Sequence, residues 1–231
     1  MKMSKIKRSL VLVSLVLVSF CLSACTQIKT TGEPSVSKNE NNISTDILSE
    51  DLSENAIERE PYVYEGESNI NIDDRSFVLE DIPESLAEET VTKYYLYTIT
   101  AEFDAMYDIL SDKDDVFKIT TENEKKLFAE GMYTQSYIIH KISTLSEEDY
   151  SEQLLDNGEE NPLYHYGWEE CNKKYGLTEY EIVYVNFTQT LSKKAIEHGA
   201  QWGNETYGRC FLVGRTSDDD SYKIYDIGTM L

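Results

Sequence analysis

Cysteine, proline and histidine are scarce in this chain, and their scarcity excludes several kinds of protein. The 231 residues include 4 Cys, 4 Pro and 3 His. There is no CxxC pair, so the tetrahedral zinc site that such pairs usually build is excluded. Two of the cysteines, Cys21 and Cys25, lie near the start of the chain. We therefore expect neither a metal nor a framework of disulfides to organise the fold.

Basic residues are half as common as acidic ones. The chain has 21 Lys and Arg against 43 Asp and Glu, which gives a formal net charge of −22. Phosphate recognition needs a basic surface, so we expect no nucleic-acid partner. The same charge repels anionic lipid headgroups, which excludes attachment to a membrane through a basic patch.

Motifs of catalysis are absent as well. The sequence has no GxSxG, HExxH, glycine-rich phosphate loop or EF-hand pattern. His165 and Glu169 stand four residues apart, as a base and its orienting acid would, although a solvated pair on a helix face is the simpler interpretation. The acidic run 218–220 is too small a set of oxygens for calcium. We assign no catalytic residue, no metal ligand and no cofactor.

The first 25 residues carry the strongest signal in the chain. Four basic residues and no acid precede Leu10, and the run from Leu10 to Leu22 is apolar except for two serines. A basic start, a short apolar run and small residues at its exit are typical of a secretory signal. The run is shorter than the roughly 20 residues of a spanning helix.

The exit of this run, Leu22-Ser23-Ala24-Cys25, resembles the lipobox of bacterial lipoproteins. The resemblance implies that residues 1–24 are a signal peptide and that Cys25 carries a thioether-linked diacylglycerol. The membrane would then be a partner through this lipid, with the rest of the chain on the extracytoplasmic side. Two acyl chains anchor stably, at ~0.8 kcal/mol per buried CH₂. A free cysteine beside an ordinary cleavage site is the alternative.

Residues 25–82 have the composition of a flexible, acidic tether. They are rich in Asn, Ser, Thr and acid, and such a segment buries too little apolar surface to fold. After loss of the signal the chain keeps 17 basic and 43 acidic residues, a net charge of −26. Two short apolar segments, 62–64 and 77–79, are either isolated apolar patches in a loose tail or edge strands docked on the domain. We favour docking for the second.

The domain is predicted to cover residues 83–231 and to begin with a long helix. Pro83 precedes it, Ser85 and Glu88 form a capping box, and acids favour its N-terminus. Apolar residues then recur every three or four positions, which predicts one buried stripe over about seven turns. The stripe consists of Ala87, Val91, Tyr95, Ile99, Phe103, Met106 and Leu110.

The rest of the domain alternates between helical and extended patterns. Capping signals at Thr121, Ser146 and Asn161 each begin a predicted helix, and Gly131, Gly158 and Gly176 end them. The predicted strands cover residues 134–145, 179–191, 205–215 and 221–229, the last two as a hairpin.

This order of elements, with the segments 208–213 (GRCFLV) and 222–228 (YKIYDIG), resembles the nuclear-transport-factor-2-like cone. That family includes ketosteroid isomerase-like enzymes and bacterial lipoprotein domains of unknown function. The resemblance implies an α+β domain whose long N-terminal helix packs in a curved antiparallel sheet, with a pocket at the open end. The pocket would be lined by Tyr95, Ile99, Phe103, Trp168, Tyr184 and Ile224.

The cone fold hosts both enzymes and inert modules, so the fold alone decides no function. We expect a non-enzymatic module of the cell envelope that binds a small apolar ligand or another envelope protein. The 17 tyrosines supply the rigid, amphipathic area that binding sites use. The alternative is a small isomerase or hydrolase with a carboxylate or His165 as its base.

Two cysteines remain once Cys21 and Cys25 are set aside. Cys171 and Cys210 would form one disulfide in an oxidising compartment, joining the third helix to the penultimate strand. Two separate buried thiols are the alternative, and the sequence leaves both open.

Overall fold

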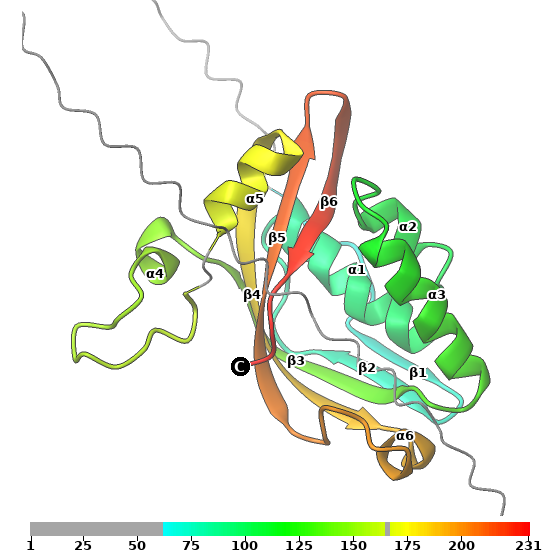
Figure 1. The fold of residues 1–231 in the computed structure, drawn as a ribbon. Coiled ribbons are helices and arrows are strands. Elements are labelled where there is room, and N and C mark those ends of the chain that lie inside the picture. The colour runs from blue at the N-terminus through cyan, green and yellow to red at the C-terminus, as the bar shows by residue number, and fades with distance from the viewer. Residues whose placement is uncertain (1–61, 165–166) are drawn as a thin grey trace, which may run out of the picture. The chain divides into compact units, whose positions relative to one another are not determined.

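Six strands and six helices make up the part of the chain that the computed structural model describes, residues 62–164 and 167–231 (Figure 1). The strands are β1 (Asn69–Ile72), β2 (Arg75–Leu79), β3 (Thr134–Thr144), β4 (Leu177–Leu191), β5 (Thr206–Thr216) and β6 (Asp219–Ile227). The helices are α1 (Leu86–Thr100), α2 (Met106–Ile109), α3 (Val116–Ala129), α4 (Glu147–Ser151), α5 (Trp168–Tyr175) and α6 (Lys193–Glu197).

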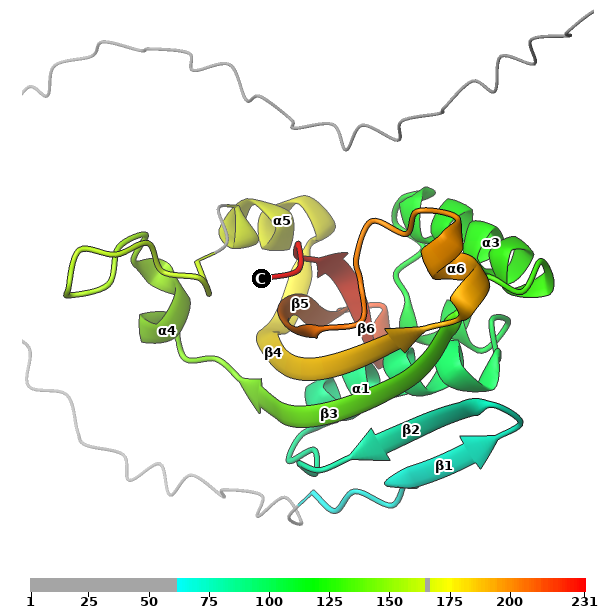
Figure 2. The same ribbon diagram turned by 90° about the horizontal axis from the view of Figure 1, so that it is seen from below.

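The strands form one open, mixed sheet in the order β1-β2-β3-β4-β5-β6. Neighbours are antiparallel except β2 and β3, which are parallel with Phe77 beside Tyr137. The long central strand β4 has apolar residues on both of its faces, because each face is covered. Figures 1 and 2 show α1, α2 and α3 on one side of the sheet and α5 on the other.

Strand periodicity explains how the two sides are separated. Val183, Phe211 and Val213 point to the α1 side, where they join the fully buried Val91 and Ile99 of that helix. Ile182, Cys210 and Leu212, which alternate with them along β4 and β5, point to the other side. There they form a second cluster with Trp168 of α5 and Tyr225 of β6. Since burial of one large apolar side chain contributes roughly 1.5–3 kcal/mol, these two clusters account for the attachment of α1 and α5.

The hairpin of β1 and β2 corrects the predicted domain boundary. Residues 69–82 were predicted to belong to the tether, but β1 and β2 are part of the sheet. Docking of the segment 77–79 is confirmed: Phe77 is completely buried. It is not an edge strand, however, because β1 covers the outer side of β2.

The predicted fold class, a long N-terminal helix packed in a curved antiparallel sheet, is wrong. The sheet is open and mixed, and α1 ends at Thr100 after 15 residues. Ala101 stops it with a left-handed backbone (φ 62°, ψ 31°). The stripe nevertheless stays buried beyond the break, because a turn and the four-residue α2 keep Phe103 and Met106 in the core.

Other predicted elements agree with the structure more closely. The four later strands lie within two residues of their predicted starts, and β5 and β6 form the expected hairpin. Ser146 makes a capping box with Asp149 at the start of α4. Two helices begin elsewhere: α3 starts at Val116 rather than near Thr121, and α5 starts at Trp168 after a turn at 161–163.

The signal, the lipobox with Cys25 and the greater part of the tether lie outside the described residues. Within 62–164 and 167–231, no helix combines the length and the apolar character that crossing a bilayer requires.

Replacing Ala101 by glycine should stabilise the domain. A left-handed conformation costs an L-residue roughly 1–2 kcal/mol, while the extra freedom of glycine in the unfolded chain returns part of that. We expect Ala101→Gly to raise the free energy of unfolding by about 0.5–1 kcal/mol in urea titrations. Ala129→Gly, in the last turn of α3, is the control and should be destabilising. A loss of stability in Ala101→Gly would contradict the assigned backbone.

Candidate functional site

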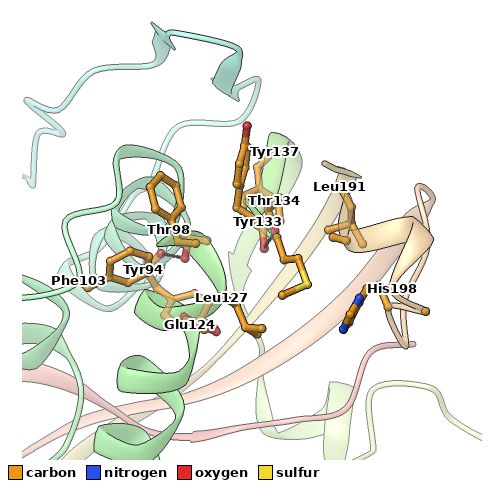
Figure 3. A pocket seen from close by; sticks show the side chains of 15 residues that line it. Tyr94, Thr98, Phe103, Glu124, Leu127, Tyr133, Thr134, Tyr137, Leu191 and His198 are labelled. Atoms are coloured by element: carbon orange, nitrogen blue, oxygen red, sulfur yellow. Dashed lines mark hydrogen bonds between the residues drawn. The ribbon is translucent and has the colours of Figure 1, made fainter. Parts of the chain in front are cut away.

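An open cavity of about 330 Å³ lies between α1 and α3 on one side and β3, the end of β4 and α6 on the other (Figure 3). Its volume falls in the range of small-molecule sites. Most of the lining is aromatic or aliphatic. The lining residues are Tyr94, Thr98, Phe103, Glu124, Leu127, Phe128, Met132, Tyr133, Thr134, Tyr137, Leu191, Ala195, His198, Gly199 and Ala200.

Aromatic contacts hold α3 at the edge of the cavity. The Phe128 ring meets Phe103 edge-on at 5.7 Å between centroids and lies 5.1 Å from the ring of Tyr133. The guanidinium of Arg75 sits 4.8 Å from the centre of the same Phe128 ring. Phe128 therefore ties the C-terminal half of α3 to the start of β3 and to β2.

Gly131 and Ser192 lie next to lining residues of the opposite wall and hold those residues in place. Gly131 adopts a left-handed backbone (φ 79°), as the sequence predicted for the end of this helix, and turns the chain from α3 into β3. The Ser192 hydroxyl donates to the Gly131 carbonyl at 2.9 Å and accepts from the Tyr133 amide at 3.3 Å. It also accepts from the Ala195 amide at 3.2 Å and so caps α6. One buried hydroxyl thus joins α6 to the turn that precedes β3.

Glu124 is the only acidic residue in the cavity lining, which contains no Lys or Arg. It is half-buried on the inner face of α3, one helical turn from Leu127 and Phe128. No group of the described residues donates a hydrogen bond to its carboxylate. Burial raises the pKa of Glu124 from 4.5 to about 7, and the positive charge of Arg209 opposes this rise.

Two tyrosines of the cavity lining, Tyr94 and Tyr137, lie within electrostatic reach of this carboxylate. Burial, followed by the charge of Glu124, raises the pKa of Tyr94, and burial is also the main cause that raises the pKa of Tyr137. Both remain neutral hydrogen-bonding groups at ordinary pH. The hydroxyl of Tyr137 lies 3.5 Å from that of Thr134, whereas the Tyr133 hydroxyl donates to Asp74 at 2.8 Å. Next to this group, the Tyr95 hydroxyl is buried without a partner in the described part of the chain.

The six residues predicted to line a pocket do not enclose one cavity. Phe103 lines the observed cavity. Tyr95, Ile99 and Ile224 are closed into the core on the α1 side, with at most 1% of their surface exposed. Trp168 and Tyr184 belong to the cluster under α5, across the sheet.

The sequence does not single out Glu124 as a site residue, because its spacing of three from Thr121 matches a capping box at the start of a helix. The helix begins at Val116, so Glu124 lies in its middle and Thr121 is a buried residue inside it. A signal was nevertheless present: an acid three and four positions before Leu127 and Phe128 shares the apolar face of the helix.

Cys171 and Cys210 carry free thiols in the structure, which is the second of the two alternatives that the sequence left open. Cys210 is buried and burial raises the pKa of its thiol to about 12. Cys171 lies on α5 with its Sγ 3.8 Å from Asp226 Oδ2, and burial with the nearby carboxylate raises its pKa. Both thiols are therefore unreactive at neutral pH.

Metal ligands and further candidate bases were sought among residues 62–164 and 167–231. No three His, Cys, Asp or Glu side chains there converge as metal ligands would. His165 lies outside the described residues, as does Cys25. The remaining candidate base besides Glu124 is His198, which is exposed at the rim of the cavity.

The unpaired carboxylate predicts a pH-dependent gain of stability in Glu124→Gln. Because the pKa is raised in the folded state, the wild type loses stability as pH rises from 4.5 to about 7, while glutamine does not titrate. The shift of the Glu124 pKa corresponds to a loss of about 3 kcal/mol in the free energy of unfolding. Solvent that enters the open cavity screens the charge and reduces this loss to about 2 kcal/mol.

We expect Glu124→Gln to be more stable than the wild type by this amount at about pH 8 and nearly equal to it at about pH 4.5. Urea unfolding across this pH range measures the difference. Glu122→Gln, an exposed change on the same helix, provides the control. A difference that grows as the pH falls would contradict the assignment.

Comparisons with known proteins give no family for this chain. No family model and no curated protein matches it. One solved structure that is similar to it is the crystal structure of the intermembrane space region of the chloroplast protein ARC6, with 15% sequence identity and a TM-score of 0.39. The match covers 65% of this chain and 98% of the other. A likeness at this level supports no argument about function.

Proposed function

We propose that the domain is a non-enzymatic binding module whose cavity holds a small, mainly apolar molecule. The observation that carries this proposal is Glu124, a carboxylate without a hydrogen-bonding partner in an open, largely apolar cavity. Removing such a group from water without compensation destabilises a protein. Groups of this kind concentrate at functional sites, where a ligand supplies the missing partner.

The remainder of the lining suits ligand binding. Apolar and aromatic walls provide the burial that drives association, and a few polar groups fix the orientation of the ligand. Here those polar groups are Glu124, Thr98, Thr134 and the neutral hydroxyls of Tyr94 and Tyr137. Docking of a second envelope protein on the domain is compatible with this arrangement but does not explain a recessed carboxylate.

A second candidate function rests on the pKa of Glu124. A carboxylate that titrates at about 7 is matched to accepting a proton at neutral pH, as a general base in an isomerase would. The lining residues include no second carboxylate, cysteine, lysine or arginine to assist it. Neutral tyrosine hydroxyls and His198 are the groups that would stabilise an enolate. Turnover of a small ketone that is lost in Glu124→Gln would favour this second function.

We further propose that the protein is a lipoprotein that presents this domain on the extracytoplasmic side of a membrane. Support comes from the basic start, the apolar run and the sequence Leu22-Ser23-Ala24-Cys25. A diacylglyceryl group on Cys25 would keep the cavity near the membrane without a spanning helix.

Replacing Cys25 tests the anchor. In a bacterium that processes lipoproteins, Cys25→Ala should move the chain out of the processed membrane fraction, because the modified sulfur is lost. Fractionation and intact-mass measurement follow the outcome. Cys21→Ala, inside the apolar run, is the matched control and should be processed as the wild type is. Normal processing and retention of Cys25→Ala would contradict the proposed anchor.

Filling the cavity tests the binding site. Ala195 lines the cavity from α6, while its neighbour Ile196 is exposed and does not. We expect the purified full chain to bind the neutral probe 4-phenylbutan-1-ol in calorimetric titrations. Binding should weaken at least about tenfold in Ala195→Phe, a loss of about 1.4 kcal/mol, and stay unchanged in Ile196→Phe. Equal binding by both variants would place the probe elsewhere.

A further inference from the structure

The charge of the cavity restricts the kind of ligand that fits it. Glu124 is the single acidic or basic residue among the fifteen that line the cavity, apart from His198 at the rim. An anionic ligand would meet a like charge and find no lysine or arginine. A neutral ligand would leave the ionised carboxylate uncompensated in its apolar surroundings. A cationic ligand avoids the repulsion and compensates the charge of the carboxylate.

We propose that the ligand is a small amine with an apolar body, whose ammonium group pairs with the carboxylate of Glu124. This inference rests on the proposed binding function and specifies the chemical class of its ligand. The ammonium would donate to a carboxylate that no described residue contacts by a hydrogen bond. Charge-assisted bonds of this kind are roughly twice as strong as neutral ones.

The aromatic lining favours the same class. Phe128 contributes a ring to the cavity wall. So do Tyr94, Phe103, Tyr133 and Tyr137, which are labelled in Figure 3. Aromatic rings attract cations by about 0.5–2 kcal/mol, depending on how far the cation is desolvated. They also cover the apolar body of the ligand. An amine can thus pair with Glu124 and contact the aromatic rings, whereas an alcohol of the same shape can only contact the rings.

Arg209 does not replace the ligand as the partner of Glu124. Its Nε donates to the carbonyl of Gly228 at 2.8 Å, and its guanidinium lies 6.0 Å from the Phe211 ring. No ion pair joins it to Glu124 among the described residues, and Arg209 is not part of the cavity lining. Its charge acts on Glu124 from β5 without occupying the position that an ammonium group would take.

The pH dependence of amine binding follows from the groups that face Glu124. These are Tyr94 from α1, Tyr137 from β3, Arg209 from β5 and His198 beyond α6. The tyrosines stay neutral and the arginine stays charged near neutral pH. Because the ammonium pairs with the ionised carboxylate, binding should tighten up to about tenfold per pH unit below the pKa of Glu124 and level off above it.

Three probes with one body test the inference: 4-phenylbutylamine, 4-phenylbutan-1-ol and 4-phenylbutanoate. Calorimetric titration of the purified full chain at about pH 8 should show the amine binding at least about tenfold more tightly than the alcohol. The carboxylate should bind most weakly. Glu124→Gln should remove the advantage of the amine while leaving the alcohol within about threefold of its wild-type affinity. Glu122→Gln, with the same change of net charge, should alter none of the three.

The outcomes separate this inference from the proposed function. If the alcohol binds in the cavity and the amine gains nothing, the inference is overturned and the binding function stands. If none of the three probes binds, both fall; if they bind equally well to Ala195→Phe, the binding lies outside the cavity and both fall as well. His198→Gln isolates the titrating group: amine binding that loses its pH dependence in His198→Gln but keeps it in Glu124→Gln would also overturn the inference.

Discussion

A buried guanidinium connects the parts of the molecule that form the cavity. Arg75, on β2, is only 7% exposed and donates to the carbonyl of Ile99 in the last turn of α1. It also lies 3.6 Å from Asp73 and faces the Phe128 ring of α3. A buried charge persists only where partners compensate for the loss of water. Here the partners are a helix C-terminal carbonyl, a carboxylate and an aromatic ring, so one side chain fixes the N-terminal hairpin, α1 and α3 relative to one another.

Arg75 lies in a segment whose composition predicted a tether. The structure differs from the prediction where contacts between residues distant in the sequence determine the fold. Periodicity predicted correctly that Val91, Ile99 and Phe103 are buried, because burial follows from spacing. It could not predict that α1 ends at Ala101, since alanine favours helix and rarely takes a left-handed backbone. The parallel pairing of β2 with β3 was equally invisible, because a five-residue strand in a polar region becomes recognisable only through its partner.

The candidate site was less predictable than the fold. The six expected pocket residues came from resemblance to a cone, and an open mixed sheet places three of them in the closed core and two on the opposite face. What forms the actual cavity is the position of α3, whose start differs from the predicted one by several residues. That difference turns Glu124 from a surface cap into a residue of the inner helix face. Local signals define caps, but the surroundings of a mid-helix acid depend on which elements pack against it.

The sparse core packing of α3 and the unpaired Glu124 have one physical origin. Within α3 only Thr121 is fully buried, and Val116 and Ile119 are exposed, so the helix contributes little to the core beyond Phe117 and Phe128. The unfilled space between α3 and β3 therefore lacks the apolar contacts that would otherwise stabilise the fold. An occupant of that space would bury Leu127 and Phe128 further and neutralise Glu124, and its binding free energy would add to the stability of the fold. Binding of the proposed ligand would therefore be coupled to the stability of the fold, and the occupied domain would be more fully packed than the empty one.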